Sequence, residues 1–185
     1  MSYQAYSDFT AQNANIQTLM AMLSDLDNSQ DSAVRVIPIV VFMAFSIEAY
    51  INSVGARVIP YWDELERLAW KKKVGILHQS AGKQANWGEG DLQFASSVFM
   101  LRDKLAHGKA ERVVGPVFST YDEALAHRQA NRLEPKWWGA LNKAWALKAK
   151  GQFTDFMKYL AALHNLHESD HLLLATGGMI HDDES

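Results

Sequence analysis

The spacing of apolar residues along the chain predicts a mostly helical protein. Over residues 10–26, apolar side chains recur every three or four positions, which indicates one amphipathic helix. Residues 32–54 are apolar on nearly every side, with Pro38 near the start and Gly55 as the expected stop. A helix apolar all round is buried, so we expect this segment to be the central core helix.

The later segments carry helical patterns as well. Pro60 and several acids open a short helix that we expect to end at the lysines of residues 71–73, because cations favour the C-terminal end of a helix dipole. The pattern further predicts helices over residues 91–107, 120–131, 136–149 and 152–174, a loop at 82–90, an irregular connector at 113–118 and a loose tail from Thr176. Short connections between helices indicate an antiparallel bundle, so the expected fold class is all-α.

Length and composition favour one soluble domain. The chain has 185 residues, of which 48% are hydrophobic and 21% charged. We expect a helical core over about residues 10–110 and a C-terminal helical extension over about 120–175. The chain has no cysteine, its start lacks the pattern of a secretory signal, and its longest apolar run, residues 36–47, is short for a bilayer. These features predict a cytoplasmic protein with no membrane partner.

The formal net charge of −3 limits the classes of partner. A protein that coats nucleic acid without specificity is basic overall, and this chain is not. Any surface that binds phosphate must therefore be local.

One segment supplies such a local site. Residues 101–109 read LRDKLAHGK, so Arg102 and His107 lie near the end of the helix expected over residues 91–107. Arginine is a permanent cation that binds phosphate, and histidine titrates near neutral pH. Cleavage of a phosphodiester without a metal ion requires both kinds of side chain. No cofactor and no metal are therefore expected.

The helical period places the two side chains on either side of one face. With Leu101 at zero and about 100° per residue, the core stripe lies near 30°, Arg102 near 100° and His107 near 240°. Phe99, Ala106 and Asp103 fall between them. If this face packed against the same helix of a second copy, Arg102 and His107 of both chains would converge in one cleft of a homodimer.

These residues carry a resemblance to a known family. The segment RDKLAHG at 102–108, preceded by FSIEAYIN at 45–52 on an apolar helix, resembles the HEPN superfamily. The hallmark of that superfamily is an arginine and a histidine with four to six residues between them, near the end of a helix. The resemblance covers roughly residues 34–109. It implies an all-α bundle, a homodimer that joins the motif helices, and a metal-independent endoribonuclease of toxin–antitoxin or antiviral systems, with RNA and an antitoxin protein as partners.

The candidate roles follow from the chemistry of RNA cleavage. His107 would be the base for the 2′-hydroxyl or the acid for the leaving 5′-oxygen, and Arg102 would bind the charged phosphate oxygens. Asp103 would orient one of these two groups. Lys104 and Lys109 would contact the RNA backbone. On the preceding apolar helix, Glu48 and Ser46 are candidate supporting residues, because an acid on a core helix requires a cation such as Arg102.

Two other functions remain open. In the first, the same fold is a non-catalytic RNA-binding module or dimeric adaptor, which the acidic net charge favours. In the second, His164, His167 and His171, spaced three and four residues apart, hold a metal ion for hydrolysis. A solvated stripe on one helix face explains the same spacing.

Overall fold

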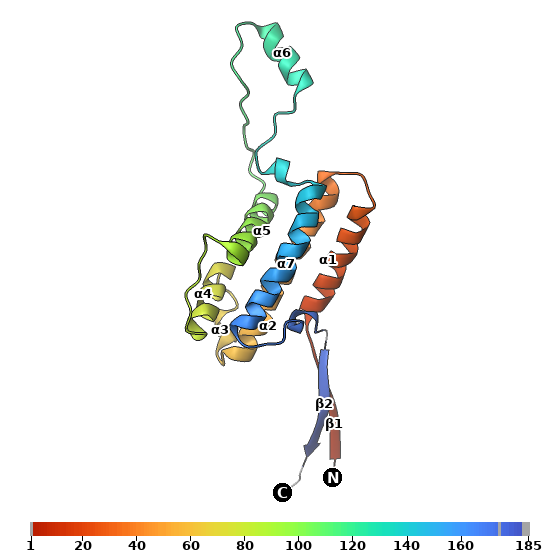
Figure 1. Cartoon of the computed structure of the whole chain (residues 1–185), viewed down its shortest axis with the longest axis vertical. Coiled ribbons are helices and arrows are strands. Elements are labelled where there is room, and N and C mark those ends of the chain that lie inside the picture. Colours follow the sequence, from red (N-terminus) through yellow and green to blue (C-terminus); the bar gives the residue numbers. More distant parts are fainter. Residues whose placement is uncertain (1, 174, 183–185) are drawn as a thin grey trace.

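The protein is mostly helical, with a small two-stranded sheet. A computed structural model describes residues 2–173 and 175–182 (Figure 1). In chain order its helices and strands are β1 (Ser2–Phe9), α1 (Ala11–Asp27), α2 (Ala33–Val58), α3 (Trp62–Leu65), α4 (Trp70–Ser80), α5 (Gly90–Ala106), α6 (Tyr121–Ala130), α7 (Lys143–Leu163) and β2 (Ala175–Asp182), with short 3₁₀ turns at Trp138–Ala140 and Asp170–Leu172. The expected all-α class therefore holds at this coarse level.

Helices α1, α2, α5 and α7 form the bundle, and α2 contacts each of the other three. The apolar stripe expected on α1 is buried, as Ile16, Leu19, Leu23 and Leu26 show. Helix α2 is long and apolar enough to cross a membrane by length and composition. Its buried positions face neighbouring helices, in agreement with the expected role of a central core helix.

Gly55 does not end α2, contrary to the expectation from sequence. The helix continues to Val58, and Trp62 of α3 packs directly on Gly55. A Cβ atom at this position would lie 2.1 Å from the Trp62 ring. Glycine here permits close packing of an indole against the helix backbone rather than a turn.

The prediction of a single helix over residues 60–73 is also wrong. Two helices occupy this region, α3 and α4, and the lysines 71–73 lie in the first turn of α4 instead of at a C-terminal end. Three cations at a helix N-terminus oppose the dipole. Their position therefore has another reason, which for Lys73 is burial beside an acid of α2.

A single helix replaces the two expected over residues 136–149 and 152–174. Helix α7 runs through the exposed Gly151, because Ala149 and Phe153 on its inner side are buried and hold it against the bundle. Since α7 packs on α1, α2 and α5, the core does not end near residue 110. The segment expected as an extension thus supplies a core helix.

The ends of the described chain form a ribbon in place of the expected loose tail. Strands β1 and β2 pair antiparallel without a bulge, from Ser2 opposite Asp182 to Phe9 opposite Ala175. The ribbon projects from one end of the bundle (Figure 1).

An arm projects from the opposite end of the bundle, between α5 and α7, and carries α6 (Figure 1). The predicted start of α6 is confirmed, because the Thr120 hydroxyl accepts a hydrogen bond from the Glu123 backbone N–H. No residue of α6 is buried, and Val114 and Val117 in the preceding connector are 80% and 96% exposed. The arm therefore has little core of its own.

Candidate functional site

Helix α5 places the arginine–histidine motif at the end of the bundle from which the arm leaves. Its predicted core stripe is confirmed, since Phe94, Val98 and Leu101 are buried and fix the rotation of the helix. His107 caps the helix, and its backbone N–H donates to the Asp103 carbonyl oxygen at 2.9 Å. The imidazole is exposed, so it can exchange a proton with solvent or substrate.

The guanidinium of Arg102 lies beside Asp103 and an aromatic ring. Its Cζ is 5.2 Å from the centre of the Phe99 ring, and its Nε is 3.3 Å from Asp103 Oδ1. The Arg102 side chain is 28% exposed. These contacts draw the cation toward the face of α5 that carries Asp103, although Nε has no hydrogen-bond partner among the described residues.

Phe99 is not available to a second copy, contrary to the expectation for this face. Its ring is 2% exposed and stacks on Trp70 of α4, with centroids 4.2 Å apart and planes 11° from parallel. Helix α4 therefore covers part of the face between Arg102 and His107. Of the three residues between Arg102 and His107, Asp103 and Ala106 stay exposed, as do His107 itself and the neighbouring Met100 and Lys104.

The exposed imidazole of His107 opens into a hollow of about 840 Å³, which we call the His107 hollow. Its walls are residues 103–105 and 107–111 together with Trp137. The structure thus brings together Asp103, Lys104, His107 and Lys109 of the predicted site. Arg102 does not line this hollow, and contacts it through Asp103.

Two residues of this hollow were not predicted from the sequence. Glu111 Oε2 accepts a hydrogen bond from Trp137 Nε1 at 3.0 Å and from Lys104 Nζ at 3.2 Å. The Trp137 and Lys104 hydrogen bonds lower the pKa of the Glu111 carboxyl. The abundance of tryptophan was the only sequence signal for this contact, because the arm must fold back before Trp137 meets α5.

Glu48 and Ser46 do not support Arg102. Glu48 Oε1 lies 3.4 Å from the Nζ of Lys73, which is 1% exposed and also donates to Asn52 Oδ1 at 3.0 Å. Ser46 is buried and donates to the Phe42 carbonyl oxygen within α2. Glu48 does pair with a cation, but that cation is the buried Lys73 of α4 and not Arg102 of α5.

The three C-terminal histidines do not converge. His167 is exposed and its Nδ1 bonds Ser169, whereas His171 is 5% exposed and packs its ring against Tyr50. Burial lowers the pKa of both His164 and His171. Within residues 2–173 and 175–182, no group of three or more His, Asp or Glu side chains is placed to hold a metal ion.

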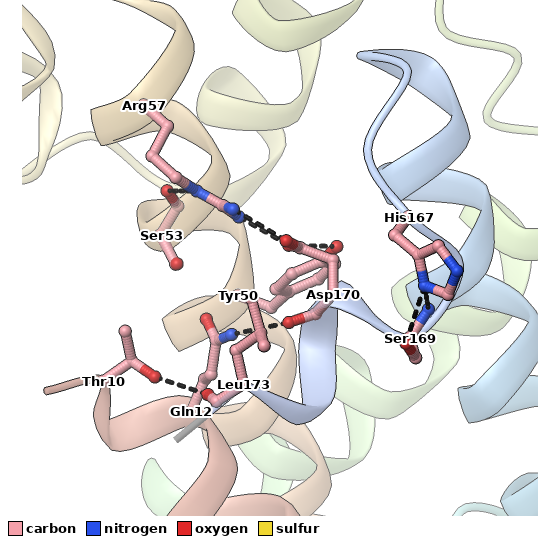
Figure 2. Close-up of polar contacts among 9 residues, drawn as sticks. All are labelled: Thr10, Gln12, Tyr50, Ser53, Arg57, His167, Ser169, Asp170 and Leu173. Atoms are coloured by element: carbon pink, nitrogen blue, oxygen red, sulfur yellow. Dashed lines mark hydrogen bonds and ion pairs between the residues drawn. The ribbon is translucent and has the colours of Figure 1, made fainter. Parts of the chain in front are cut away.

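A second polar cluster lies at the ribbon end of the bundle and joins the C-terminal segment to α1 and α2 (Figure 2). Asp170 accepts two hydrogen bonds from Arg57, at 2.8 and 2.6 Å, and one from the Tyr50 hydroxyl at 3.0 Å. Arg57 lowers the pKa of the Asp170 carboxyl, and burial with Asp170 nearby raises that of Tyr50 above its usual range. Both carboxylate oxygens are engaged, so the cluster holds the chain in place rather than offering a reactive group.

The α5 end is thus the better candidate for chemistry. It offers an exposed imidazole, two lysines, a guanidinium bound to the neighbouring acid, and a tryptophan that walls the same hollow. These groups can transfer protons and bind phosphate. Searches of protein-family models, curated proteins and solved structures give no match to this chain.

Proposed function

We propose that this protein is a metal-independent endoribonuclease of the HEPN type, with a toxin or antiviral role in the cytoplasm. The observation that carries the proposal is the exposed His107, five residues after Arg102, in a hollow that it shares with Asp103, Lys104 and Lys109. An imidazole beside cations suits the transfer of protons at a phosphodiester.

The chemistry needs no group outside RNA and protein. His107 removes the proton from a 2′-hydroxyl, the 2′-oxygen forms a bond to the adjacent phosphorus, and the bond to the 5′-oxygen breaks. The 5′-oxygen takes a proton from an imidazolium, and a 2′,3′-cyclic phosphate remains on the other product. Arg102 stabilises the negative charge on the phosphate oxygens in the transition state.

A homodimer brings these groups together in this proposal. On one chain, Arg102 and His107 lie on different sides of α5, with the buried Phe99 between them. A second copy packed on the exposed stripe of Met100, Asp103 and His107 would place its Arg102 near the imidazole of the first. An antitoxin protein would be a further partner of this dimer.

The alternative function is an RNA-binding module or dimeric adaptor that does not cleave. The contacts of Arg102 with Asp103 and Phe99 favour it, because they occupy part of a guanidinium that catalysis needs. Binding without cleavage would require only the lysines and exposed rings.

Incubation with structured RNA in EDTA tests the proposal. The wild type should yield products with 2′,3′-cyclic phosphate ends, and His107→Ala should yield none. His167→Ala, which removes another exposed imidazole, is the matched control and should cleave normally. Equal cleavage by the wild type and His107→Ala would refute the catalytic role.

Mixing two inactive variants tests the shared site. If each site takes Arg102 from one chain and His107 from the other, equal amounts of Arg102→Ala and His107→Ala should recover about a quarter of wild-type activity, because half the dimers are mixed and each has one complete site. A site within one chain would recover none.

A further inference from the structure

Three hollows adjoin one another along α4 and α5. The His107 hollow shares Asp103 and Lys104 with a second hollow of about 370 Å³, which Trp70 and Lys71 also line; we call it the Trp70 hollow. That hollow shares Lys71 with a third, of about 530 Å³, lined by Lys72 and Trp87, which we call the Trp87 hollow. The shared side chains make one concave track that leads away from His107.

The track is locally basic on a chain whose net charge is −3. Four lysines line it, Lys71, Lys72, Lys104 and Lys109, against two carboxylates. Glu111, which is bound by Lys104 and Trp137, lies at the His107 end, and Asp103 lies where the His107 and Trp70 hollows meet. The positions of Lys71 and Lys72 at the N-terminus of α4 disfavour the helix itself but place two cations beside the track.

Half-buried tryptophans alternate with these cations. Trp137 lines the first hollow, Trp70 the second and Trp87 the third. Each ring is fixed by the protein: Glu111 holds Trp137, Phe99 stacks on Trp70, and Trp70 meets Trp87 edge to face at 5.6 Å. Lys71 Nζ lies 5.7 Å from the Trp70 ring centre and 5.3 Å from that of Trp87.

We propose that this track binds single-stranded RNA and leads it to His107, an inference that rests on the proposed function. Lysines spaced along a groove bind successive phosphates, and rigid aromatic rings between them stack bases. A duplex keeps its bases stacked on one another, so the rings would find no free base face. The tryptophans therefore select a single strand.

Binding is measured with the full chain carrying His107→Ala, which prevents cleavage, and a fluorescein-labelled single-stranded 12-mer RNA in EDTA. The double variant Lys71→Ala/Lys72→Ala should weaken binding about tenfold at 0.1 M salt. It should also reduce the slope of log affinity against log salt by about 1.4, since each neutralised phosphate contributes about 0.7 for a single strand. Lys148→Ala/Lys150→Ala removes two exposed lysines of α7 and should change neither value.

Substitution of Trp87 tests stacking separately from charge. Trp87→Leu keeps an apolar side chain but removes the ring, and should weaken binding about tenfold, whereas Trp87→Phe should restore most of it. Circular dichroism checks that each variant is folded. Single-stranded DNA should bind within a fewfold of RNA, and duplex RNA at least tenfold more weakly.

The outcomes separate this proposal from the function proposed above. If wild type cleaves RNA but the Lys71/Lys72 and Trp87 variants bind normally, the track is refuted and the cleavage site stands. If those variants lose binding while wild type never cleaves, the track stands and the catalytic proposal is refuted. Duplex RNA that binds as tightly as a single strand overturns the stacking argument.

Discussion

Removal of the Asp170 carboxylate should loosen the polar cluster at the ribbon end of the bundle. In Asp170→Ala, Arg57 loses two hydrogen bonds and the Tyr50 hydroxyl loses its acceptor (Figure 2). Tyr50 is 0% exposed, whereas the Arg57 side chain is 39% exposed. Water can replace the carboxylate at Arg57 but cannot reach the Tyr50 hydroxyl.

These exposures set the expected magnitude. A buried donor left without a partner costs about 1–3 kcal/mol. The ion pair contributes about 1 kcal/mol after allowance for the solvent around Arg57. The free energy of unfolding should therefore fall by about 3 kcal/mol, which lowers Tm by about 6–12 °C in a protein of this size.

Urea and thermal unfolding of four proteins measure the effect: wild type, Asp170→Ala, Tyr50→Phe and the double variant. Tyr50→Phe alone should lower the free energy of unfolding by about 1 kcal/mol. In the Asp170→Ala background it should leave this free energy unchanged or raise it, because the hydroxyl is already unpaired. Additive losses, or a loss below about 1 kcal/mol in Asp170→Ala, would refute the reasoning. Since the folded-state pKa of Asp170 is lowered, its stabilisation is complete above about pH 4 and is lost at lower pH, where the gap between wild type and Asp170→Ala should close.

Three further measurements test the packing and electrostatics of the bundle. Gly55→Ala should lower the free energy of unfolding by about 3 kcal/mol in a urea titration, because the new methyl group meets the Trp62 ring; a neutral result would contradict that contact. Lys73→Met should lower the free energy of unfolding by less than about 1 kcal/mol, since an apolar chain of similar volume replaces a buried cation whose acid partner is 37% exposed. Lys73→Ala should lower it by about 2–3 kcal/mol, because it leaves a cavity. Burial lowers the folded-state pKa of His164 and His171 below the ordinary value near 6.5, so stability should be complete above about pH 6.5 and decrease toward pH 5. A Tm that does not change between pH 7.5 and 5 would be inconsistent with those shifts.

The sequence predicted the local features of the fold well. The buried stripes of α1 and α5, the loop before α5 and the cap of α6 depend on residues close together in the chain. Glycine misled the prediction at two positions, because packing outweighed intrinsic preference. Trp62 packs on Gly55, and the buried neighbours of Gly151 keep the chain helical at that position.

Features that depend on distant contacts could not be predicted in this way. The ribbon pairs residues near 2–9 with residues near 175–182, and neither strand shows a strong alternating pattern by itself. In the candidate site, Asp103, Lys104, His107 and Lys109 lie within one stretch of sequence and share one hollow. Trp137, by contrast, reaches that hollow only when the chain returns from the arm, and the cation beside Glu48 comes from a different helix than expected.

The arm has a consequence for how freely this chain can change in length. Helices α5 and α7 pack against each other, so they hold the two ends of the arm together. This holds for any sequence between the two ends. Doubling or halving the length of a flexible loop changes the free-energy cost of closing it by only about 0.6 kcal/mol. Excision of α6, or insertion of a reporter domain in its place, should therefore leave the bundle folded, provided that Glu111 and Trp137 remain at the base of the arm.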